Sequence, residues 1–210
     1  MSRCIITISR EFGCGAREIA RELASRLGVT LYDRDLVDMT AKKAGVNVEV
    51  IKESDEALVK SGNRLFAEFG YGSTTSFLSE DAIRVQAEVI RDIANQQESC
   101  VIFGRCADYI LQEHPNVVNF FLYAPLPKRI KHIAENYKLT EPEAQKLIKR
   151  VDRQRHNYYK YVTGHNRGDR ENKDLMIDVS TYGVKGTVDL MCTAIAMQYP
   201  EGFGEESVVI

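Results

Sequence analysis

The chain of 210 residues lacks the patterns that mark several large classes of protein. Its five cysteines are odd in number and scattered, and no two of them form a Cys-x-x-Cys pair. This usage argues against a disulfide framework or a zinc site and favours a reducing compartment. The first apolar stretch is cut off by Arg10 and Glu11, and the longest, 117–127, is too short to cross a bilayer. We therefore expect a cytoplasmic protein without a signal peptide, a membrane span or a metal-ligating set.

The chain also lacks a strong charge of either sign. Its 28 Lys and Arg against 30 Asp and Glu give a formal charge of -2, which favours neither nucleic acid nor a membrane as partner. The charge is nevertheless uneven, because residues 128–170 hold 12 Lys and Arg against 5 Asp and Glu. This basic segment indicates a local anionic ligand, and a solvated helix face is the alternative.

Short apolar runs alternate with helical patterns along the chain, as is typical of βα units around a parallel sheet. A hydrophobic content of 44% is sufficient for one globular domain over residues 1–210. Gly28 is expected to end the first helix, and the capping-box spacing at 140–143 predicts the start of a long one. Residues 47–97 are mostly helical in pattern, and the chain from 200 onward is expected to be a loose tail. The expected strands are 5–8, 29–32, 100–103, 117–122 and 175–179.

The segment Ser9–Glu18 joins the first strand to the first helix and contains Gly13 and Gly15. Ligands bind at the carboxyl ends of strands in open α/β sheets, where helix N-termini point backbone N–H groups outward. Glycines let such a loop curl around a phosphate without a Cβ in the way. This pattern favours phosphate binding, and an ordinary tight βα connection is the alternative.

The loop lacks the lysine and hydroxyl of the common phosphate-loop signature, whose positions are taken here by Ala16 and Arg17. Arg17 is our first candidate for the missing cation because the first helical turn lies nearest the phosphates, and Arg10 is the competing candidate. Cys14 is expected to be a small filler, with a reactive thiol as the alternative. Glu18 fits a carboxylate that interacts with the helix dipole.

Distinctive motifs occur in order along the chain at Thr7–Gly15, Phe103–Arg105 and Asp152–Arg155. They resemble the cytidylate kinase-like family, a branch of the P-loop nucleoside monophosphate kinases. The resemblance covers about Cys4 to Tyr199, and Cys106 stands where cytidylate kinases carry an aspartate after their Gly-Arg element. The matching segments are Thr7–Gly15, Arg17–Ile19, Leu31–Arg34, Phe103–Arg105, Asp152–Arg155 with Tyr158 and Tyr159, and Leu175, Ile177 and Asp178.

The resemblance implies an α/β, P-loop NTPase-type three-layer fold with a five-stranded parallel sheet, a helical acceptor-binding insertion and a lid. We expect a core of residues 1–45 and 98–199, a helical acceptor-binding region at 46–97 and a lid at about 150–173. The implied activity is transfer of the γ-phosphate of ATP to CMP or dCMP, with ATP and Mg²⁺ as cofactors. The alternatives are a kinase of another small acceptor and a nucleotide-binding regulatory module with little or no transfer.

The resemblance and the strand ends together give three groups of candidate residues. The acceptor group includes residues that follow strand ends, although Arg34 also has carboxylate neighbours with which it could pair. Mg²⁺ is expected to be held by phosphates and water. Nucleotides are the expected partners, and the oligomeric state is left open. The candidates are Ser9, Arg10, Gly13, Cys14, Gly15, Ala16, Arg17 and Glu18 for nucleotide phosphates; Asp33, Arg34, Gly104, Arg105 and Arg129 for the acceptor; and Arg17, Arg105, Arg150, Arg153 and Arg155 for catalysis.

Overall fold

The computed structural model describes residues 3–33, 35–43, 45, 80–96 and 98–200. It divides into two compact units, one of residues 1–31 and 97–210 and one of residues 32–96. The expected domain boundaries remain predictions. Most of the predicted helical region 46–97 lies outside the described residues, and so does the predicted tail from 200 onward apart from Pro200 itself. In the second unit, α2 (Asp35–Lys43) packs against α5 (Glu80–Asn95).

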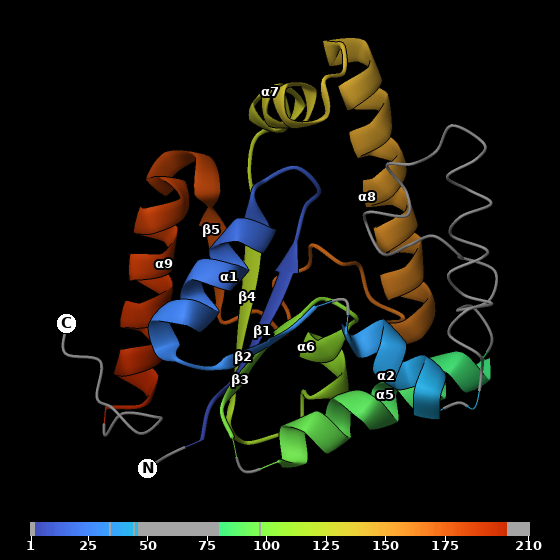
Figure 1. Ribbon diagram of the computed structural model, residues 1–210, viewed down its shortest axis with the longest axis vertical. Helices are drawn as coiled ribbons and strands as arrows, with labels where there is room; N and C mark the ends of the chain where they lie inside the picture. The colour runs from blue at the N-terminus through green and yellow to red at the C-terminus, as the bar shows by residue number, and fades with distance from the viewer. Residues whose placement is uncertain (1–2, 34, 44, 46–79, 97, 201–210) are drawn as a thin grey trace. The chain divides into compact units, whose positions relative to one another are not determined.

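The first unit is built on a parallel sheet, as the alternating pattern predicted (Figure 1). Its strands are β1 (Ile5–Arg10), β2 (Thr30–Tyr32), β3 (Cys100–Phe103), β4 (Val117–Tyr123) and β5 (Leu175–Asp178), in the order β2-β3-β1-β4-β5. The central strand β1 pairs with β3 on one side and β4 on the other, with Ile8 opposite both Phe103 and Phe120. This pairing brings the loops after β1, β3 and β4 to the same edge of the sheet.

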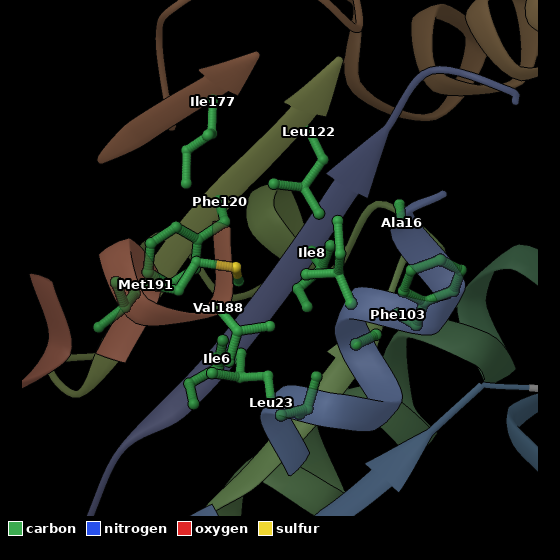
Figure 2. Packing of buried hydrophobic residues seen from close by; sticks show 14 of the residues in the cluster. Ile6, Ile8, Ala16, Leu23, Phe103, Phe120, Leu122, Ile177, Val188 and Met191 are labelled. Atoms are coloured by element: carbon green, nitrogen blue, oxygen red, sulfur yellow. The ribbon is translucent and has the colours of Figure 1, made fainter. Parts of the chain in front are cut away.

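The core lies between the sheet and two helices, α1 (Ala16–Leu27) and α9 (Val179–Gln198), which pack against each other. Figure 2 shows Leu23 of α1 and Val188 and Met191 of α9 beside Ile6 and Phe120 of the sheet. All five side chains are fully buried. Because successive strand residues point to opposite faces, Ile5 and Thr7 face the other side of β1, where α6 (Ala107–Ile110) packs.

Two helix boundaries lie where local sequence patterns predicted them. Gly28 ends α1 in a left-handed conformation, and the Thr140–Glu143 capping box begins α8 (Glu141–Thr163). The predicted end of β5 at Val179 is wrong by one residue. Asp178 caps α9 by accepting a hydrogen bond from the Ser180 N–H at 2.9 Å, so Val179 is already helical.

The helix α7 (Leu126–Tyr137) was not expected from the sequence. Prolines at 125 and 127 suggest a turn after the strand, but proline is well accommodated at the first positions of a helix. The helix has 12 residues and buries Arg129 and Ile133. Its importance lies in what these two residues contact, which is the loop after β1.

Candidate functional site: an anion cradle after the first strand

The loop between β1 and α1 is curled by two glycines with positive φ, Gly13 at 87° and Gly15 at 81°. A side chain is disfavoured at Gly13 for a second reason. A Cβ placed there would stand 2.9 Å from Cγ1 of Ile133 and 3.3 Å from Cβ of Arg129, which both belong to α7. The glycine is therefore needed both for the backbone conformation and for the close approach of α7.

The curled loop exposes backbone donors at the positive end of α1. Among the hydrogen bonds of the described residues, none caps this helix with a side chain, and none uses the N–H groups of Gly13 or Gly15. Helix N-termini with such uncommitted N–H groups attract anions. We call this loop, residues 11–15, the cradle; that it binds phosphate stays a prediction, which its geometry suits.

Cys14 lies inside this loop as a buried filler. Its Sγ is 3.3 Å from the carbonyl oxygen of Glu11 and 3.5 Å from that of Leu122. Burial raises the pKa of its thiol to about 11, although the Ala16 N–H and nearby arginines act in the opposite direction. Its burial and its raised pKa both favour the packing role expected from the sequence over a nucleophilic one.

Two arginines from the two ends of the loop converge on the ring of Phe103, the last residue of β3. Cζ of Arg10 lies 4.0 Å from the ring centroid, and Cζ of Arg17 lies 5.9 Å from it. Arg10 is 9% exposed, and its guanidinium lies against Gly104, where a Cβ would stand 2.0 Å from Nη1 of Arg10. Arg10 and Arg17, the two cations that could replace the missing phosphate-loop lysine, therefore both lie at the carboxyl end of β3.

The turn after β3 carries the predicted acceptor arginine in a left-handed conformation, with φ of 61° at Arg105 and 57° at Cys106. This conformation is uncommon for residues with side chains. Beyond the turn, the buried Asp108 accepts hydrogen bonds through Oδ2 from Tyr159 Oη at 3.1 Å and from Lys173 Nζ. Burial and the neighbouring Asp108 raise the pKa of Tyr159. The Arg105 turn is thus connected to α8 and to the segment before β5.

A second ion-pair network lies under the cradle and was missed by sequence reasoning. The Asp152 carboxylate of α8 accepts from the Phe12 N–H at 2.9 Å, from Arg167 Nη2 at 2.9 Å and from Arg129 Nη1 at 2.6 Å. Burial acts to raise the pKa of Asp152, but Arg167, the Phe12 N–H and Arg129 together hold it below its usual value. Asp152 stands in one of the motifs that carry the family resemblance, and Arg167 stands in the predicted lid. Their contacts with Phe12 and Arg10 span 140 and 157 residues along the chain. No local pattern signals contacts over such distances.

The remaining candidates are divided between the cradle and its surroundings. Arg155 is buried on α8, with Cζ 5.4 Å from the ring of Phe12. Arg129 is buried, and its donors bind Phe12, Ala124 and Asp152, which assigns it to the support of the loop. Its contact with the acceptor stays a prediction.

The other candidates differ in exposure. Ser9 and Ala16 are buried beside the loop, whereas Glu18, Arg150 and Arg153 are exposed. Asp33 belongs to the other compact unit, and Arg34 lies outside the described residues.

Neither a metal-binding cluster nor a membrane-spanning helix is found among the described residues. No group of three or more His, Cys, Asp or Glu side chains in this part of the chain is arranged to hold a metal ion. No helix in the same part is long and apolar enough to span a membrane.

Comparison with known proteins assigns the chain to a family. The model of the cytidylate kinase-like family matches residues 5–181, which include the cradle, the Arg105 turn and all of α8. This chain belongs to the cytidylate kinase-like family. The sequence resemblance is thereby confirmed.

The curated relatives of this cytidylate kinase-like protein are distant. A cytidylate kinase from Thermococcus sibiricus is 24% identical over 199 residues, covering 94% of this chain and 91% of that protein. A cytidylate kinase from Methanosarcina barkeri is 26% identical over 107 residues, or 50% of this chain, and the match spans only 59% of that protein.

Solved structures confirm the fold of this cytidylate kinase-like protein. An uncharacterized protein from Eubacterium ventriosum superposes with a TM-score of 0.71 at 26% identity, over 92% of this chain and 98% of that one. A shikimate kinase from Bacteroides thetaiotaomicron superposes with a TM-score of 0.54 at 11% identity, over 92% and 99%. The five-stranded parallel sheet flanked by helices is the fold of P-loop kinases.

Proposed function

We propose that this protein is a nucleoside monophosphate kinase that transfers the γ-phosphate of ATP to CMP or dCMP. Membership of the cytidylate kinase-like family and relatives named cytidylate kinase support the acceptor class. The observation that carries the proposal is the convergence of Arg10 and Arg17 on Phe103, beside the Arg105 turn. Cations from the donor loop thus border the turn predicted to hold the acceptor phosphate.

The donor phosphates would lie in the cradle. Backbone N–H groups of Gly13 and Gly15 and the N-terminus of α1 supply partial positive charge, and Arg10, Arg17 and Arg155 surround the loop. Phosphoryl transfer depends mainly on positioning and on charge stabilisation of the transferred group, and these groups suit both tasks. With no described cluster of metal ligands, Mg²⁺ would be held by the phosphates themselves and water.

The acceptor phosphate would contact Arg105. A guanidinium binds a phosphate with two parallel charge-assisted hydrogen bonds, which fixes both position and orientation. Arg105 follows a buried strand at the edge of the sheet where ligands bind in open α/β folds. The basic segment that contains α8 would supply further cations over the phosphates, as a lid does.

A second reading is a nucleotide-binding module that retains the cradle and transfers little or no phosphate. The observation that favours it is Ala16, which stands where phosphate-loop kinases carry a lysine. The arginines at the cradle and the acceptor turn favour transfer, because a protein that only senses one nucleotide has less need of a second phosphate site. A kinase of another small acceptor is the third reading, since P-loop kinases with this fold act on several acceptors.

The test is an ADP-release assay with ATP, Mg²⁺ and separate acceptors: CMP, dCMP, UMP, AMP, GMP and shikimate. We expect turnover with CMP or dCMP to exceed that with every other acceptor. Faster turnover with another compound in the panel would change the proposed acceptor but would still support kinase activity. No turnover above the ATPase background with any acceptor, at high enzyme concentration, would overturn the kinase and favour the nucleotide-binding module.

A further inference from the structure

Three consecutive residues, Arg10, Glu11 and Phe12, lead from β1 into the cradle, and their backbone groups are held by residues distant in sequence. The carbonyl of Arg10 accepts from Arg167 Nη1 at 2.9 Å, and the carbonyl of Phe12 accepts from Arg129 Nη1 at 3.1 Å. The Phe12 N–H donates to Asp152 Oδ1 at 2.9 Å. Between them, the Glu11 N–H donates to the carbonyl of Leu122 in β4 at 2.9 Å.

The two arginines in this arrangement meet at one carboxylate, that of Asp152. Asp152 binds the Phe12 N–H directly, and it holds the guanidinium groups of Arg129 and Arg167 that bind the two carbonyls. Glu11 adds a second carboxylate, with Oε2 3.2 Å from Nε of Arg129. The side chains of Arg129, Arg167 and Asp152 are 9%, 12% and 20% exposed, so water screens these contacts little.

We propose that Asp152 is a positioning residue for the donor phosphates: it fixes the peptide groups of Arg10 and Phe12, so that the glycine loop beyond them keeps its curled conformation before the ligand arrives. This proposal rests on the proposed function only in that the cradle binds the polyphosphate chain of a nucleotide. It does not require that transfer occurs.

The expected consequence is a loss of phosphate affinity in a protein that still folds. Gly13 and Gly15 have left-handed conformations within a wide range that glycine allows, so the curled loop must be selected by its surroundings. When the competent fraction of a site falls, its apparent Kd rises by the inverse of that fraction. Loss of the Asp152 charge loosens both arginines and so weakens two backbone contacts at once, those to the carbonyls of Arg10 and Phe12. We expect an increase in Kd of about tenfold or more, as for other supporting residues of a binding site.

The experiment measures Kd for Mg²⁺-tripolyphosphate and for Mg²⁺-ATP by calorimetry, with the melting temperature of each variant. Asp152→Asn keeps the size of the side chain and one acceptor for Phe12 but removes the charge that holds both arginines. The matched control is Asp189→Asn, which removes an exposed aspartate that pairs with Arg26 on the outer helices. We expect both ligands to bind Asp152→Asn about tenfold or more weakly, and Asp189→Asn to bind like the parent.

Arg167→Gln supplies a second variant, which retains the Asp152 contacts with Phe12 and Arg129. We expect it to weaken tripolyphosphate binding by less than Asp152→Asn does. The double variant should bind no worse than Asp152→Asn alone, because Arg167 acts on Arg10 from the same carboxylate. If the increases in Kd of the two single variants multiply in the double variant, Arg167 contacts the ligand independently of Asp152. That result would contradict the proposal that Asp152 acts through Arg167.

The outcomes separate this inference from the proposed function. Parent-like Kd in the folded fraction of both variants, with only a lower melting temperature, would make the network merely structural and overturn the inference. If Asp152→Asn does not fold, parent-like binding by Arg167→Gln overturns it equally. If the parent protein binds ATP but forms no CDP, only the proposed kinase activity is overturned. A parent that binds neither ligand overturns both.

Discussion

The guanidinium of Arg10 lies over the ring of Phe103, with 4.0 Å between Cζ and the ring centroid. The contact follows from strand register, since Ile8 of β1 is opposite Phe103 of β3 and Arg10 lies two residues further along the same face. The absence of a side chain at Gly104 leaves room for the guanidinium. One stacking contact therefore joins the loop that would bind the donor to the turn that would bind the acceptor.

Arg17 is our first candidate for the cation that replaces the phosphate-loop lysine. Arg17→Gln is expected to weaken ATP binding and lower kcat/KM by roughly tenfold to hundredfold, the value of one charge-assisted hydrogen bond. Arg10→Gln is the comparison, measured in parallel for ATP affinity and turnover. A parent-like Arg17→Gln beside a severely impaired Arg10→Gln would transfer the role to Arg10. Parent-like behaviour of both would assign the charge to arginines of α8.

Gly104→Ala is expected to displace Arg10 from Phe103, because the new Cβ would occupy the position of Nη1. The positive φ of 80° adds strain that costs about 1 kcal/mol of folding free energy. Gly28→Ala is the matched control, since Gly28 also has a positive φ but no atom within 4 Å of an added Cβ. Urea unfolding should show destabilisation of both variants, larger in Gly104→Ala because it also loses the Arg10 stacking contact, whereas kcat/KM should fall only in Gly104→Ala. Equal activity of the two would show that the Arg10 contact is dispensable.

Arg105→Ala tests the acceptor side. A guanidinium that grips a monophosphate makes bonds of roughly 1.5–3 kcal/mol, so kcat/KM for CMP should fall about tenfold to hundredfold. The affinity for ATP measured without CMP should be unchanged. A variant that melts early and retains full activity would make Arg105 a structural residue of its left-handed turn.

Cys14 should resist alkylation at neutral pH, because burial raises the pKa of its thiol to about 11. Only about one molecule in a thousand then carries the thiolate at pH 8, and the rate should rise about tenfold per pH unit up to pH 10. Mass spectrometry of the Cys14 peptide after timed iodoacetamide treatment measures this rate. A plateau near pH 8 would contradict the packing role and restore the reactive thiol.

The sequence predicted the features that depend on local patterns. The five strands, the glycine loop, the end of α1 at Gly28 and the Thr140 capping box all follow from short stretches of residues. The support of the cradle could not be predicted in this way, because Phe12 and Asp152 meet only when α8 packs beneath the loop. Arg129 illustrates the same limit, since its position after β4 was apparent but its burial in an ion-pair network was not.

The central claim is that the cradle and the Arg105 turn act together in phosphoryl transfer. The most direct measurement incubates the protein with γ-³²P-labelled ATP, Mg²⁺ and CMP and separates the nucleotides by chromatography. The account predicts labelled CDP in a one-to-one ratio with ADP, and formation of labelled CDP about tenfold to hundredfold slower in Arg105→Ala at low CMP concentration. Tight ATP binding without labelled CDP, under conditions where ATP is in excess, would contradict it.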